Sequence, residues 1–183
     1  MDDYNAWVVG PIARANVERL QAEVIPRAEA WESSSGAEFA PKKTALIHFS
    51  RTRRRVQDAG PLLTRGVTVE ASPQVKILGV VMDQELRYHA HAARMAKRGL
   101  RAAQALRRLR GLLPSMARQL YTSMVTPVVD YASVVWSTYA PSTAITTAEQ
   151  VQRVGAMAVT AGFKTVSLVV AEAEAALVPV KDR

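Results

Sequence analysis

The sequence contains no cysteine, no glycine-rich phosphate loop and no run of about 18 apolar residues. Without cysteine, disulfide bonds and metal sites built on thiolates are excluded. Without the phosphate loop, we expect no small-molecule cofactor. Because no apolar run is long enough to cross a bilayer and no secretory leader is visible, we expect no membrane partner and an intracellular location, in the nucleus or the cytoplasm.

Acidic residues are also absent from the whole stretch between Glu85 and Asp130, in a chain whose net charge is +8. The basic residues of this stretch are Arg87, Arg94, Lys97, Arg98, Arg101, Arg107, Arg108, Arg110 and Arg118. Arginine dominates, and its guanidinium fork matches the oxygens of a phosphate group. This charge pattern indicates a polyanionic partner, and the alternative is a solvated basic helix face.

The order of sequence patterns predicts an α+β fold in two parts. In residues 1–85, we expect a short strand over 4–9, a helix over 12–31 and one or two strands over 39–49. A hairpin follows, which pairs 66–70 with 74–83 across the turn at 71–73. From residue 86 to residue 183 the pattern is helical only, with helices expected over 88–110, 114–126, 142–161 and 167–177.

The predicted helix over 88–110 has two distinct faces. Small apolar residues recur on one side, whereas spacings of three, four and seven place the basic side chains on another. The members of this basic face are Arg94, Lys97, Arg98, Arg101 and Arg108.

Three segments in order resemble the downstream half of a reverse transcriptase of the non-LTR retrotransposon type. They are Asp2-Asp3, then Phe39-Ala40-Pro41-Lys42-Lys43-Thr44, then 75–83 with Leu78-Gly79 at its centre. Later segments resemble the thumb and the linker that follow in the family. They are Leu86-x-Tyr88-x-x-His91, Gln119-Leu120-Tyr121, 127–136, 151–155 and 162–166.

The resemblance implies a role for each matching position. Asp2 and Asp3 would be catalytic carboxylates that hold Mg²⁺, and Lys43 would act near the departing pyrophosphate. Leu78 and Gly79 would lie in the primer-grip hairpin. Residues 1–85 would form the C-terminal part of the polymerase palm, and 86–183 a helical thumb and connection region. The partner would be an RNA/DNA template-primer duplex, held by the basic face.

The sequence departs from the family because the first catalytic aspartate, the fingers and the nucleotide pocket have no counterpart upstream. We therefore expect a polymerase fragment that is inactive alone, binds Mg²⁺ weakly and retains duplex binding. Two alternatives stay open: a non-enzymatic basic nucleic-acid-binding module, and a truncated relic without function. Without the upstream half, palm core residues such as Ile47 and Val80 should be exposed and strand edges unpaired, which favours a fragment or a relic over an adapted module.

Histidines and aromatic residues are interpreted as structural. His89 and His91 are two residues apart and would point in different directions on a helix, and His48 is distant in sequence, so we expect no zinc site. The larger aromatic side chains are expected to anchor the core rather than to stack on nucleobases. These residues are Trp7, Trp31, Tyr121, Tyr131 and Trp136.

Overall fold

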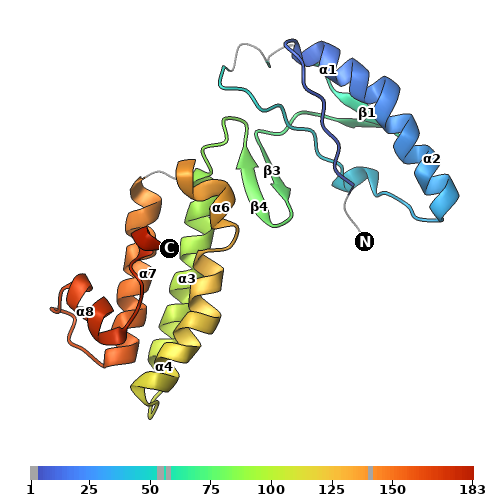
Figure 1. Cartoon of the computed structure of the whole chain (residues 1–183). Coiled ribbons are helices and arrows are strands. Elements are labelled where there is room, and N and C mark those ends of the chain that lie inside the picture. The colour runs from blue at the N-terminus through green and yellow to red at the C-terminus, as the bar shows by residue number, and fades with distance from the viewer. Residues whose placement is uncertain (1–3, 53–55, 57–58, 140–141) are drawn as a thin grey trace. The chain divides into compact units, whose positions relative to one another are not determined.

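The chain divides into two compact units, Met1–Leu86 and Arg87–Arg183. The structure, a computed structural model, describes residues 4–52, 56, 59–139 and 142–183. The first unit combines helices with small antiparallel sheets and the second is helical, which confirms the α+β class (Figure 1). Asp2 and Asp3 lie outside the described residues.

One long helix opens the first unit. It comprises α1 (Ala13–Arg19), a π-helical segment (Leu20–Val24) and α2 (Ile25–Ser35), and it ends at Gly36, whose φ is 69°. Proline cannot donate an i→i−4 hydrogen bond, and its ring clashes with the carbonyl one turn earlier. The wider π turn directly before Ile25-Pro26 relieves that conflict, so the helix continues through the proline.

Two separate hairpins supply the strands of the first unit. One pairs β1 (Leu62–Thr64) with β2 (Val67–Val69), and the other pairs β3 (Gln74–Ile77) with β4 (Val80–Asp83). The predicted pairing of 66–70 with 74–83 was therefore wrong. Each strand turns back on a nearer partner, because a two-residue turn with glycine in second place lies between them: Arg65-Gly66 in the first hairpin and Leu78-Gly79 in the second.

Two other predicted strands are also absent from the described structure. Residues 4–10 are irregular, and no described segment pairs with their backbone. In 39–49, Pro41–Lys43 forms a 3₁₀ turn, and only Leu46 makes a β-bridge, to Ala71. Aromatic and β-branched composition favours a strand, but without a partner for its hydrogen bonds a strand does not form.

A small core holds the first unit together. The helix packs on the first hairpin and the bridge segment through Val17, Leu46, Ala59, Leu62 and Val69. Val80, expected to be exposed palm core, is only 5% exposed, so that expectation was wrong for this residue. Ile47 is half-buried.

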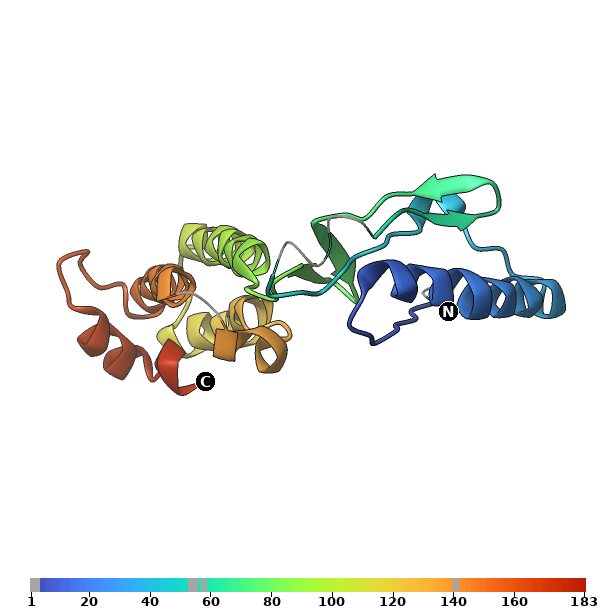
Figure 2. The ribbon, with the colours of Figure 1, turned by 90° about the horizontal axis from the view of Figure 1, so that it is seen from above.

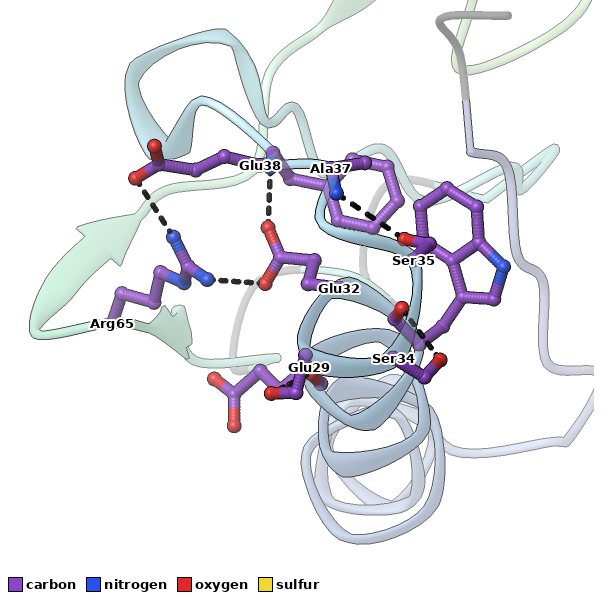
Figure 3. Close-up of polar contacts among 10 residues, drawn as sticks. Glu29, Glu32, Ser34, Ser35, Ala37, Glu38 and Arg65 are labelled. Carbon is purple, nitrogen blue, oxygen red and sulfur yellow. Dashed lines mark hydrogen bonds and ion pairs between the residues drawn. The ribbon is translucent and has the colours of Figure 1, made fainter.

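A buried carboxylate ties α2 to the first hairpin. Glu32 is 4% exposed, accepts a hydrogen bond from the Phe39 backbone N–H and lies 2.5 Å from Arg65 Nη2. Arg65 Nη1 also lies 3.2 Å from Glu38 Oε1 (Figure 3). A buried charge must be paired, so this contact fixes the hairpin turn against the helix.

Helices make up the second unit, and the expected helices over 88–110, 114–126, 142–161 and 167–177 are confirmed with small shifts. Their bounds are α3 (His89–Arg108), α4 (Pro114–Leu120), a π-helical segment (Tyr121–Val125), α5 (Thr126–Val129), α6 (Ser133–Trp136), a 3₁₀ turn (Ser137–Tyr139), α7 (Ser142–Thr160), α8 (Leu168–Ala175) and a final 3₁₀ turn (Val180–Asp182). Within this unit α7 packs against α3, α4 and α8 (Figure 2).

Glycine allows a close contact between α3 and α5. A Cβ on Gly99 of α3 would lie 2.4 Å from Val129 Cγ2, which is closer than any real contact. The core around this contact includes Ala103, Val129 and Val151. Small residues on α3 therefore let α5 and α7 approach its backbone.

A buried polar chain crosses the core of the second unit. Gln152 is fully buried, accepts a hydrogen bond from the Tyr121 hydroxyl at 3.2 Å and donates to Glu172 Oε1 at 2.6 Å. It also donates to the Val178 carbonyl at 2.8 Å. Every polar atom of the Gln152 amide therefore has a hydrogen-bond partner. This network of hydrogen bonds fixes how α7 packs against α8.

Candidate nucleic-acid interface

The helix α3 presents one buried face and one charged face. The buried face consists of His91, Ala92, Met95, Ala96, Gly99, Ala103 and Leu106. The five predicted basic residues, Arg94, Lys97, Arg98, Arg101 and Arg108, are all exposed and share the opposite side. The structure therefore brings them together in one row about 20 Å long, given a rise of about 1.5 Å per residue.

In the part of the chain that the structure describes, no carboxylate pairs with this row. None of its five side chains forms an ion pair with a described residue. By contrast, Arg14 and Arg19 on α1 lie beside Glu18 and Glu23. Unpaired and exposed guanidinium groups keep all their donors free for an external acceptor.

The charges of the row also repel one another. Arg94 stands four residues before Arg98, and Lys97 four residues before Arg101. Like charges at this spacing destabilise a helix by about 0.2–0.5 kcal/mol per pair. Arg108 is favoured by the negative end of the helix dipole, but the residues in the middle of α3 gain nothing from it. The positive charges at the central positions of α3 are therefore not stabilised by the helix itself.

A shallow cavity extends the charged face beyond the end of α3. Its volume is about 480 Å³, and its lining consists of Gln104, Arg107, Arg108 and Arg110. Three guanidinium groups and an amide offer hydrogen-bond donors to a phosphate.

The second hairpin holds Leu78 in an unusual conformation. Leu78 has φ 47° and Gly79 has φ 87°, so both central residues of the turn lie in the left-handed region. This backbone conformation is strained for a leucine. The Leu78 side chain is also 71% exposed, so core packing does not explain why a leucine occupies this position. Leu78 lies at the tip of the hairpin between β3 and β4.

Of the three predicted catalytic positions, the structure describes Lys43. Lys43 is exposed at the end of the 3₁₀ turn Pro41–Lys43. Its expected neighbours, Asp2 and Asp3, fall outside the described residues. Within the described ranges, no group of three His, Asp or Glu side chains is arranged to hold a metal ion.

The histidines lie in different environments. Burial lowers the pKa of His48, whose Nε2 has no hydrogen-bond partner in the described part of the chain. Burial also lowers the pKa of His91, against the opposite effect of a hydrogen bond with the Tyr131 backbone. The His91 and Trp136 rings make an edge-to-face contact, with 5.6 Å between their centroids. Both imidazoles are therefore neutral at pH 7, and His91 is a core residue.

The aromatic residues divide into two groups, and the prediction that all five anchor the core was wrong. Tyr121 and Trp136 are buried, whereas Trp7, Trp31 and Tyr131 are 82%, 45% and 47% exposed. Large apolar side chains are usually buried, but composition alone does not reveal which of them find a neighbour.

A second cavity, of about 470 Å³, lies in the first unit. The described residues that line it are Tyr4, Arg27, Trp31 and Phe39. Sequence reasoning missed this site. The available signal was the four-residue spacing of Arg27 and Trp31, which places both on one face of a helix.

Among the residues that the structure describes, no helix is both long and apolar enough to cross a membrane. Comparison of the chain with models of protein families, with curated proteins and with solved structures finds no match.

Proposed function

We propose that the chain is the downstream palm and thumb portion of a retrotransposon reverse transcriptase, and that it binds a template-primer duplex of RNA and DNA through the basic face of α3. The observation that supports binding is the row of five exposed basic side chains, none of which forms an ion pair with a residue that the structure describes. Palm and thumb identity rests on the ordered sequence resemblance alone.

The mode of binding follows from the type of contact. Guanidinium groups along one helix face meet the phosphates of a duplex and displace its counterions. Phosphate contacts position a duplex but read no sequence. Binding is therefore independent of sequence and weakens steeply as salt rises. In this proposal the tip of the second hairpin contacts the primer strand. The Leu78 side chain is exposed there, and Gly79, which has no side chain, lets the backbone of the nucleic acid come close.

The test is a salt titration of duplex affinity. A labelled RNA/DNA duplex is titrated with the protein at several salt concentrations, and log K is plotted against log salt. Each phosphate contact contributes about 0.9 to the slope. The double change Arg98→Ala and Arg101→Ala is expected to reduce the slope by about two units, equally for unrelated duplex sequences.

A matched control removes the same number of positive charges from another helix, α1. Arg14→Ala with Arg19→Ala also removes two positive charges, from side chains that already pair with Glu18 and Glu23. This variant is expected to bind like the native chain. Equal weakening by both double variants would show that net charge alone drives binding, and would overturn the assignment to α3.

The polymerase part of the proposal has its own experiment. Joining the chain to the upstream fingers and palm of a reverse transcriptase is expected to give primer extension that requires Mg²⁺. Extension should disappear when Asp2 and Asp3 are both changed to Ala, and slow when Lys43 is changed to Ala. Extension that survives the loss of both aspartates would contradict the polymerase assignment and leave the nucleic-acid-binding module as the alternative. That alternative is favoured because the basic face of α3 belongs to a unit that has its own core.

A further inference from the structure

Three aromatic rings form a partly open cluster in the first unit. The Phe39 ring stacks on Trp31 with 5.4 Å between centroids and an angle of 27° between planes. Tyr4 lies 5.6 Å from Phe39 on the same cluster. Trp31 is 45% and Tyr4 is 49% exposed, so ring surface remains accessible to a ligand.

A cation borders the same cavity. Arg27 precedes Trp31 by one helical turn of α2 and lines the cavity with the three rings. Arg27 forms no ion pair with a described residue, and none of the described lining residues is acidic. The nearby carboxylate Glu32 is buried against Arg65 (Figure 3). The site therefore joins flat apolar surfaces with one free positive charge.

From this geometry we propose a second binding site, in which the cavity lined by Tyr4, Arg27, Trp31 and Phe39 takes an unpaired nucleobase of single-stranded nucleic acid. The base stacks on the exposed ring surface, and Arg27 contacts the adjoining phosphate. The volume of about 470 Å³ suits one nucleotide rather than a helix.

The proposed ligand differs from that of α3. Bases inside a duplex already stack on their neighbours, so their faces are not accessible to the rings. An unpaired base exposes both faces, and stacking on an aromatic residue strengthens binding about 5-fold to 150-fold per base, equivalent to about 1–3 kcal/mol. A proline-rich peptide also fits grooves lined by aromatic rings. Among the described residues, Arg27 has no ion-pair partner and no carboxylate lines the cavity, which favours the anionic ligand.

The experiment compares two oligonucleotides with equal phosphates. The full chain is titrated with a fluorescent ten-nucleotide oligothymidylate and with an abasic oligonucleotide of the same length. Trp31→Ala is expected to weaken binding to oligothymidylate at least fivefold and to leave abasic binding unchanged. Arg27→Ala is expected to reduce the salt slope by about 0.7 for both oligonucleotides.

Three controls keep the outcomes distinct. Trp7→Ala removes a more exposed tryptophan outside the cavity and is expected to change nothing. If Trp31→Ala unfolds, Trp31→Leu keeps apolar volume without a ring and Trp31→Phe keeps a ring, so only the leucine variant should lose base-dependent affinity. Arg98→Ala with Arg101→Ala should weaken duplex binding but leave the difference in affinity between oligothymidylate and the abasic oligonucleotide unchanged. This result would separate the cavity from the function proposed for α3.

Native affinity of the Trp31→Leu variant for oligothymidylate would overturn the proposal. So would an equal loss of abasic binding, since that loss would not depend on a base. Binding of a proline-rich peptide that depends on Trp31, without base-dependent binding of the oligonucleotide, would identify the cavity as a peptide site instead.

Discussion

Gly155 lies directly against the ring of Tyr121. A Cβ at Gly155 would lie 2.0 Å from Cε2 and 2.3 Å from Cδ2 of that ring. Tyr121 is 1% exposed and its hydroxyl donates to Gln152, so the ring has no free space into which to retreat. The helix α7 therefore packs against Tyr121 only while residue 155 has no side chain.

Gly155→Ala is expected to destabilise the second unit by about 1–3 kcal/mol, because an added methyl group overpacks a closed core. Urea unfolding monitored by circular dichroism measures the change. Gly162→Ala is the control, since Gly162 is exposed and its Cβ would come no closer than 3.0 Å to another atom, the Thr160 hydroxyl oxygen. Equal stability of the two variants would mean that Tyr121 can shift.

Alkaline pH is expected to destabilise the chain through Tyr121. Burial raises the pKa of Tyr121 from 10.0 to about 12, and the nearby Arg183 opposes the shift. A raised folded-state pKa means that the stabilising contribution is complete below pH 10 and is lost as pH rises through 12. The loss is about 3 kcal/mol.

Tyr121→Phe isolates this effect, because other groups titrate in the same range. The difference in unfolding free energy between the native chain and the phenylalanine variant should be constant below pH 10. It should then fall between pH 10 and 12. A flat difference across that range would contradict the buried phenol.

Arg65→Met is expected to destabilise the first unit by about 2 kcal/mol, because Glu32 would stay buried without its cation. This free-energy change is smaller than that expected for a fully buried ion pair, because the Arg65 side chain is 35% exposed and water screens its charge. Adding Glu32→Gln should restore part of the loss, and thermal unfolding of the single and double variants measures it. Arg14→Met breaks an exposed pair and should change stability by less than about 0.5 kcal/mol.

Leu78→Asn is expected to stabilise the second hairpin by about 1 kcal/mol, because asparagine adopts positive φ more readily than leucine. The same change should weaken duplex binding if the exposed leucine touches the primer strand. Chemical unfolding and the duplex titration are measured on one preparation. Loss of both stability and affinity would show that Leu78 has a structural role instead.

Sequence patterns predicted the second unit better than the first. The helix α3 has strong periodicity, because its buried and basic residues repeat at helical spacing over 20 residues. Strands in the first unit are only three or four residues long, too short for alternation to identify partners. The turn at Arg65-Gly66 was the missed signal, since glycine in the second place favours a two-residue hairpin turn. Leu78-Gly79 was placed at the centre of a hairpin by the family resemblance and not by this turn signal. The cavity around Trp31 depends on contacts between segments distant in sequence, which no local pattern encodes.

The π-helical segment Tyr121–Val125 keeps a row of buried side chains nearly in line along the helix. Ala117, Tyr121, Val125 and Val129 recur every four residues and are all buried. In an α-helix each such step rotates the side chain by about 40°, so three steps would carry the row about 120° around the axis. The wider turn takes up one extra residue and cancels most of that rotation. Removing one residue from this segment would turn Val129 away from Gly99, so the length of the helix is as tightly constrained as its composition.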